Sequence, residues 1–315
     1  MFSAAVGGFM YGVPASSAGN KAIFGYGHTA GSNTQVSTTN LVSNTGVVAT
    51  DTTGVGTARS YLAAAGYGTD KAIFGYGTTN SGSVAGGTAV TNKVSNTGVV
   101  ATDTTGVGTA RSYLAAAGYG TDKALFGYGR DSSGTITAVT NLVSNAGVVA
   151  TDTTGVGTAR RYLAAAGYGA DKAIFGYGNN SGGARVAITN LVSNTGVVAT
   201  DTTGVGTARQ ALAAAGYGTD KAIFGYGLTT VEVSMTNLVS NTGVVATDTT
   251  GVGTARGYLA AAGYGTDKAI FGYGANSAES VKYSMTNLVS NTGVVATDTT
   301  GVGTARYRIA AASYG

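Results

Sequence analysis

The sequence predicts an all-β fold built from six copies of one unit, and three observations support this. The motif Lys-Ala-(Ile or Leu)-Phe-Gly-Tyr-Gly recurs at intervals of 47 to 52 residues, which is the signature of a repeat protein. Thr, Val, Tyr and Gly dominate each unit, and no apolar pattern has a helical period. Hydrophobic residues make up 43% of the chain, which is enough for a core despite 53 glycines. The motif begins at Lys21, Lys71, Lys123, Lys172, Lys221 and Lys268.

Each unit contains four segments of strand length, separated by turn residues. In one unit they cover residues 113–120, 123–129, 140–146 and 147–154. The first segment is nearly all Ala, Gly and Tyr, which suits a strand that lines a narrow central shaft. The second is a near-continuous apolar run, typical of a strand that is covered on both faces. The fourth ends in Thr-Asp-Thr-Thr and is expected to face solvent, so we predict a four-stranded meander.

The two ends of the sequence predict how the units are joined. The first motif, at Lys21, has no Ala-rich strand before it, whereas residues 306–315 supply such a strand with no motif after it. We expect this C-terminal strand to complete the first sheet, which hides the sheet edges. The prediction is a six-bladed β-propeller of four-stranded blades over residues 21–315, closed by the C-terminal strand and preceded by an N-terminal extension, residues 1–20. An open solenoid is the alternative, and it requires polar caps that we do not find.

The unit resembles the repeat of the kelch family of β-propellers. The resemblance rests on an Arg that ends one unit, an inner strand, and an aliphatic and aromatic strand that ends in glycines (AIFGYG). A third strand, a tight turn (SNTG) and a polar outer strand that returns to Arg complete it. It covers about residues 21–315, and it implies the propeller fold.

Two places in the unit vary between the copies, and the rest is almost identical. The first lies between Gly-Tyr-Gly and Thr-Asn, where the copies read HTAGSNTQVST, TTNSGSVAGGTAV, RDSSGTITAV, NNSGGARVAI, LTTVEVSM and ANSAESVKYSM. The second is the pair of residues after the repeated Arg. In an up-and-down blade both places lie on one face of the disc. We predict a variable recognition face; loops that simply tolerate change are the alternative.

The variable places contain residue types that suit binding. Asn, Ser, Gly and Thr with isolated charged residues and Tyr are typical of adaptable binding loops. We expect the tyrosines to ring the mouth of the shaft as amphipathic contacts, and packing at the starts of the inner strands is an equally open role. The candidate binding residues are Tyr61, Tyr113, Arg130, Asp131, Arg161, Tyr162, Asn179, Asn180, Arg185, Gln210, Glu232, Tyr258, Glu279, Lys282, Tyr307 and Arg308.

Several features argue against catalysis and cofactors. His28 is the single histidine, expected to be exposed in a variable segment, and the chain has no cysteine, so a His-based triad lacks support. The Asp of Thr-Asp-Thr-Thr-Gly recurs in every unit, which favours a scaffold role. We expect it to pair with the Arg eight residues later, as Asp51 with Arg59. We expect no cofactor, and weak calcium binding at this stretch remains an alternative.

Charge and hydropathy restrict the classes of partner. The formal net charge is +4, and the surplus cations are scattered, which is a poor footprint for nucleic acid. No apolar run approaches the length that spans a membrane, and the N-terminus lacks the basic start of a secretory signal. We therefore expect neither nucleic-acid binding nor membrane insertion.

The sequence predicts a non-enzymatic binding protein. Near-identical units that vary on one face are similar to the host-recognition propellers of phage tail fibres or bacterial adhesins. The expected place is a virion, in a tail fibre or tail tip, with a host cell-surface glycan or protein as partner. Residues 1–20, which include Phe2, Phe9 and Met10, are expected to contact other virion subunits. A lectin-like or protein-interaction scaffold of a bacterial cell, extracellular or at its surface, is the alternative.

Overall fold

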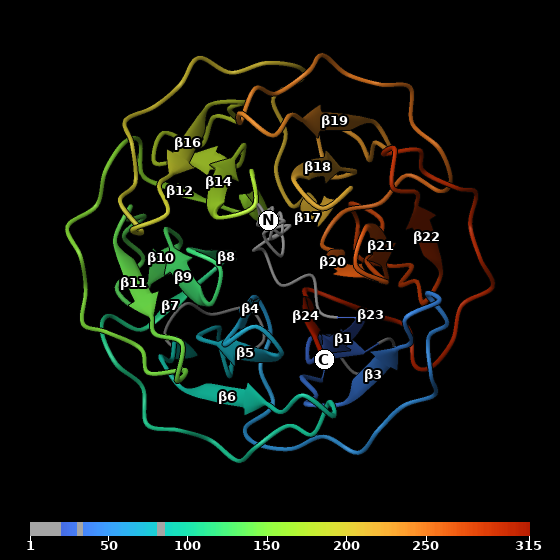
Figure 1. Cartoon of the computed structure of the whole chain (residues 1–315), viewed down its shortest axis with the longest axis horizontal. Coiled ribbons are helices and arrows are strands. Elements are labelled where there is room, and N and C mark those ends of the chain that lie inside the picture. Colours follow the sequence, from blue (N-terminus) through green and yellow to red (C-terminus); the bar gives the residue numbers. More distant parts are fainter. Residues whose placement is uncertain (1–19, 30–33, 81–85) are drawn as a thin grey trace, which may run out of the picture.

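The computed structural model describes residues 20–29, 34–80 and 86–315. This part of the chain is all-β, and its main elements are six three-stranded antiparallel sheets that lie around a common centre (Figure 1). The first sheet has the order β24 (Ala310–Tyr314), β1 (Lys21–Gly25), β3 (Thr39–Val42). The other five sheets are β4-β5-β6 (Ala63–Tyr67, Lys71–Gly75, Thr91–Val94), β8-β9-β11 (Ala115–Tyr119, Lys123–Gly127, Thr140–Val143), β13-β14-β16 (Ala164–Tyr168, Lys172–Gly176, Thr189–Val192), β17-β18-β19 (Ala213–Tyr217, Lys221–Gly225, Thr236–Val239) and β20-β21-β22 (Ala260–Tyr264, Lys268–Gly272, Thr286–Val289).

The C-terminal strand β24 pairs with the first strand β1, as the two ends of the sequence indicate. The register runs from Lys21 opposite Tyr314 to Gly25 opposite Ala310, and Figure 1 shows the two strands side by side. This pairing matches the inner pairing of every other sheet, such as β4 with β5. The inner strands also contact one another in sequence order, and β24 contacts both β20 and β4.

The burial of the strands confirms the predicted gradient from the centre outward. Ala72, Ile73 and Phe74 of the middle strand β5 are completely buried, because a sheet covers each of their faces. The inner strand β4 alternates between buried and half-buried residues, so one of its faces packs on the neighbouring sheet and the other lines the centre. In the outer segment Val99 is 65% exposed.

The predicted fourth strand is wrong in detail, because the outer segment meets the third strand only at two isolated bridges. In the second sheet Val94 pairs with Val100 and Thr91 pairs with Thr104, so the register shifts by one residue between the bridges. This is a β-bulge, which interrupts the ladder. The amide of Asn92 fills the gap by donating to Ala101 O at 3.0 Å. A side chain thus takes the place of a backbone pair, and each sheet has three strands.

A buried arginine joins each unit to the next. Arg59 has no exposed surface; its guanidinium lies 4.9 Å from the centroid of the Tyr26 ring and donates to Asn92 Oδ1 at 2.6 Å. At each of the five remaining junctions, the guanidinium of the equivalent arginine lies 4.3–5.0 Å from the centroid of a tyrosine ring. Each therefore contacts the tyrosine that follows the middle strand of one unit and the third strand of the following unit. The six arginines are Arg59, Arg111, Arg160, Arg209, Arg256 and Arg306.

The expected pair of Asp51 with Arg59 is wrong, because the repeated aspartate belongs to a different junction. Arg59 lies 3.7 Å from Asp103 of the following unit. Asp51 instead accepts hydrogen bonds from the backbone N–H and the hydroxyl of Thr304, at the opposite end of the chain. Burial acts to raise the pKa of Asp51, but the hydrogen bonds from Thr304 and Asn40 outweigh it and hold the pKa below its usual value. Each aspartate thus fastens its unit to the preceding one.

Candidate functional site

The two variable places of each unit lie side by side. The first residue after the repeated Arg pairs with the first residue of a variable segment in all six units. The segment then folds back, and its first residue bridges to a residue near its end. We call the surface that these segments and pairs form the variable face. The pairs across the two places are Ser60 with Thr78, Ser112 with Arg130, Arg161 with Asn179, Gln210 with Leu228, Gly257 with Ala275, and Tyr307 with His28.

The second residue after each repeated Arg forms a ring at the centre of this face. Each of the six donates its backbone N–H to the carbonyl of the one before it, and Tyr61 N donates to Arg308 O at 3.0 Å. All six have φ between 54° and 60°, a region that side chains other than Gly rarely adopt, so the hydrogen bonds hold a strained backbone. We call them the mouth ring: Tyr61, Tyr113, Tyr162, Ala211, Tyr258 and Arg308.

The tyrosines of the mouth ring pack on one another over the centre. The centroids of Tyr61 and Tyr113 are 4.0 Å apart, and those of Tyr113 and Tyr162 are 4.6 Å apart. Tyr61 is 9% exposed, so this tyrosine takes the packing role, one of the two open in the sequence. The ring surrounds a shallow depression of about 70 Å³. Tyr307, which we expected in the ring with the other tyrosines, is not part of it, because it occupies the first position after Arg306 and Arg308 occupies the second.

Arg308 is the centre of an ionic cluster between the last and the first units. Its Nη2 donates to both carboxylate oxygens of Glu279, at 2.5 and 2.6 Å. Its guanidinium also lies 4.3 Å from the centroid of the Tyr61 ring. Tyr307 OH donates to Glu279 Oε2 at 3.1 Å, and Lys282 Nζ lies 5.4 Å from the centroid of the Tyr307 ring. Four candidate binding residues, Glu279, Lys282, Tyr307 and Arg308, thus come together.

His28 is buried, so its expected exposure is wrong. It pairs with Tyr307 across β2 (His28–Thr29) and β23 (Arg306–Tyr307), and the two rings meet edge to face at 5.4 Å. Burial, together with the positive charges of Arg308 and Lys282, lowers the pKa of His28 to about 4. The imidazole is therefore neutral at pH 7.

We expect stability to fall on mild acidification because of His28. Its folded pKa is about 4 and its ordinary value is 6.5, so between these values the unfolded chain takes up a proton that the folded chain does not. The loss between pH 7 and pH 5 is about 2 kcal/mol. His28→Thr, which introduces the residue that Thr78 provides in the next unit, removes this loss. Urea unfolding at both pH values measures it, and an equal loss in the variant contradicts the assignment.

The other candidate binding residues lie on the variable face in units three to five. Arg130 and Asp131 form β10, which pairs with β7 (Arg111–Ser112). Asn179 and Asn180 form β15, which pairs with β12 (Arg160–Arg161). Arg185 bridges to Asn179 and is exposed. Gln210 pairs with Leu228, which also bridges to Glu232.

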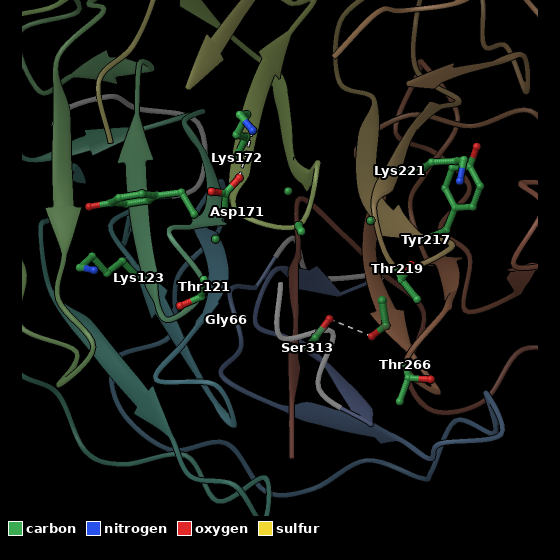
Figure 2. A pocket seen from close by; sticks show the side chains of 16 residues that line it. Gly66, Thr121, Lys123, Asp171, Lys172, Tyr217, Thr219, Lys221, Thr266 and Ser313 are labelled. Carbon is green, nitrogen blue, oxygen red and sulfur yellow. Dashed lines mark hydrogen bonds and ion pairs between the residues drawn. The ribbon is translucent and has the colours of Figure 1, made fainter. Parts of the chain in front are cut away.

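Sequence reasoning missed a cavity at the opposite end of the inner strands. It has a volume of about 110 Å³ and is lined by glycines of five inner strands, by Ser313 and by residues of the nearly constant turns (Figure 2). Ser313 Oγ donates to Gly263 O at 2.8 Å, and Lys172 pairs with Asp171 at 3.1 Å. The signal was the serine in the last copy of the Ala-Ala-Ala-Gly-Tyr strand, where the other copies have glycine. The Ser-Asn-(Thr or Ala)-Gly turns lie beside them, since Asn145 Nδ2 donates to Asp122 at 3.1 Å, and we call the surface of both sets of turns the constant face.

No protein-family model matches the chain, and no curated protein is similar to it in sequence. Within the described ranges, no three His, Cys, Asp or Glu side chains are grouped so that they would hold a metal ion. The same residues include no helix that is long and apolar enough to cross a membrane. The predicted contacts of residues 1–20, with Phe2, Phe9, Met10 and Tyr11, fall on residues outside the described part of the chain, apart from Asn20.

Proposed function

We propose that the chain is a six-bladed β-propeller closed by β24. The contacts that support this proposal run around a closed circle. The inner strands contact one another in order with β24 between β20 and β4, and the backbone hydrogen bonds of the mouth ring return from Arg308 to Tyr61. Asp51 binds Thr304 as each other repeated aspartate binds the threonine of the preceding unit. In an open solenoid the first and last units do not touch each other, so these contacts between them could not form.

The propeller is a non-enzymatic recognition protein that presents the variable face to a host or other cell surface. One observation carries this proposal: the two places that differ between the copies pair with each other on one face, while the turns of the constant face hardly differ. Loops that tolerate change without a role would differ on both faces. A virion, in a tail fibre or tail tip, is the setting we propose, with a cell-surface glycan or protein as the partner.

The test exchanges two variable segments of equal length. Residues 130–139 (RDSSGTITAV) and 179–188 (NNSGGARVAI) swap places, which leaves composition, length and net charge unchanged. The matched control exchanges Ala146 and Thr195, in equivalent turns of the constant face. We expect the segment exchange to lower binding to cells, or to a glycan array, at least about tenfold, and the control to leave it unchanged. The proposal is refuted if the segment exchange and the control exchange bind equally well, or if the native protein binds neither cells nor any glycan of the array.

A further inference from the structure

The variable face carries more cations than carboxylates. Its segments and pairs contain five basic side chains, of Arg130, Arg161, Arg185, Lys282 and Arg308, against the acidic side chains of Asp131, Glu232 and Glu279. The rest of the chain carries most of its charges in the repeated Asp, Arg and Lys of the scaffold, which nearly cancel. The surplus positive charge on this face therefore belongs to the residues that distinguish one unit from another.

Each of the three carboxylates is already bonded within the protein. Glu279 binds Arg308 at 2.5 Å. Asp131 accepts hydrogen bonds from the backbone N–H groups of Ser133 and Thr135, at 3.0 and 2.8 Å. Glu232 accepts one from the backbone N–H of Ser277. Only one of the three thus neutralises an arginine of this face.

Three arginines of units three and four remain without a carboxylate. Within the described residues, none of the ion pairs includes Arg130, Arg161 or Arg185. Arg130 donates from Nε to the carbonyl of Gly134 at 2.8 Å. The Nε of Arg161 is buried without a hydrogen-bond partner. We call these three residues the arginine sector.

In unit four, the pairing of β12 with β15 and the bridge that follows it place Arg161 and Arg185 on either side of Asn179. Asn179 pairs with Arg161 on one side and bridges to Arg185 on the other. Residues paired across neighbouring antiparallel strands have side chains on the same face, with Cβ atoms about 5 Å apart. The side chains of Arg161 and Arg185 therefore leave the backbone on the same face as that of Asn179, whose Oδ1 is buried without a hydrogen-bond partner. The guanidinium of Arg161 also lies 5.3 Å from the centroid of the Tyr162 ring, at the edge of the mouth ring.

We infer that the arginine sector binds an anionic group of a surface glycan, a carboxylate or a phosphate. This inference rests on the proposed recognition function and names its ligand class. The planar fork of an arginine binds both oxyanions through two parallel hydrogen bonds, and Tyr162, which is half-buried, leaves part of its apolar surface for the sugar ring beside the anion. A nucleic acid is a poorer match, because its backbone requires a continuous basic stripe rather than one sector of the disc.

The repeats themselves supply substitutions that the fold tolerates. The triple variant Arg130→Thr, Arg161→Ser, Arg185→Gln places in the arginine sector the residues that Thr78, Ser112 and Gln35 provide at equivalent positions. The control variant Lys93→Leu, Lys123→Gln, Lys172→Gln removes the same charge from outside the variable face. Thermal unfolding followed by circular dichroism checks that both variants are folded.

The measurement uses oligosaccharides that are identical except for one carboxylate or phosphate, beside their neutral counterparts. We expect the native protein to bind an acidic member at least about tenfold more tightly than the neutral one, more weakly in about 0.5 M salt, and the triple variant to lose this preference. The control variant keeps it. The member that binds best shows which oxyanion is preferred.

Several outcomes overturn the inference. Equal binding of acidic and neutral members by the native protein, or an unchanged preference in the triple variant, would refute the anionic ligand class. Neither result would refute the recognition function. Duplex DNA bound as tightly as the acidic glycan assigns the sector to a different class of ligand. No binding to any glycan or cell removes both proposals together.

Discussion

Deletion of residues 306–315 is expected to abolish the cooperative folding of the whole chain or to lower its unfolding temperature severely. The deletion removes β24 from the first sheet, which exposes the inner edge of β1, and it opens the mouth ring at Arg308. It also removes the buried side chains of Arg306, Ile309 and Tyr314. Each large apolar side chain contributes about 1.5–3 kcal/mol by burial, and a typical domain is stable by about 5–15 kcal/mol. The loss is therefore comparable with the whole free energy of unfolding.

Circular dichroism during heating and in urea measures this effect. The truncated chain is expected to show no cooperative transition, or one at least about 20 °C below that of the native protein. A synthetic peptide with the sequence of residues 306–315 restores the transition, and a peptide of the same composition in scrambled order does not. A truncated chain that unfolds within about 5 °C of the native protein contradicts the role that we assign to β24.

Arg59→Met lowers the free energy of unfolding by about 3–5 kcal/mol. The substitution keeps an apolar stem of similar length but removes the cation that lies over Tyr26 and donates to Asn92 at 2.6 Å. It also leaves Asp103 without the positive charge 3.7 Å away. Removal of a buried guanidinium costs this much because Asn92, which loses its partner, stays out of water, whereas Asp103 is partly exposed and contributes less. Arg209→Met is expected to cost at least as much, because Arg209 has the equivalent tyrosine and asparagine partners and also donates to Tyr226 O and Thr207 O.

Urea unfolding at pH 7 compares the two variants with Arg185→Gln. Arg185 is exposed, so its substitution is expected to change the free energy of unfolding by less than about 0.5 kcal/mol. If all three variants are equally stable, the arginines do not join the units and the repeated Arg has another role. If only Arg59→Met is destabilised, the junctions are not equivalent.

Much of the architecture follows from the sequence, because near-identical copies reveal it. The Ala-rich first segment, the apolar second segment and the Thr-Asp-Thr-Thr end of the fourth predict the gradient of burial that the structure has, with Val99 exposed in the outer segment. The missing strand before Lys21 and the extra strand after Arg306 predict that β1 pairs with β24. The first inference depends on features that all copies share, and the second depends on a strand that the first copy lacks and the last copy supplies.

The errors concern side chains that replace backbone pairs or cross between units. The bulge beside Asn92 is invisible in the sequence, since Asn also fits a regular strand. The spacing in the sequence suggests Arg59 as the partner of Asp51, whereas the partner in the structure is Thr304, which lies in the last unit of the chain. The burial of His28 depends on Tyr307 and Arg308, which stand 279 and 280 residues away in the chain.

A disulfide between β1 and β24 tests the central claim, that the C-terminal strand completes the first sheet and brings all variable segments to one face. The chain has no cysteine, so Ala22→Cys and Ser313→Cys introduce the only two thiols. These residues are cross-strand partners, and such partners have Cα atoms about 4.5–5.5 Å apart, within reach of a disulfide. In the control pair, Ala22→Cys with Ala214→Cys, the second cysteine lies in β17. We predict a monomer with a bond between residues 22 and 313 after mild oxidation, shown by mass spectrometry of its peptides, and none in the control. Free thiols, or bonds only between two chains, would contradict it.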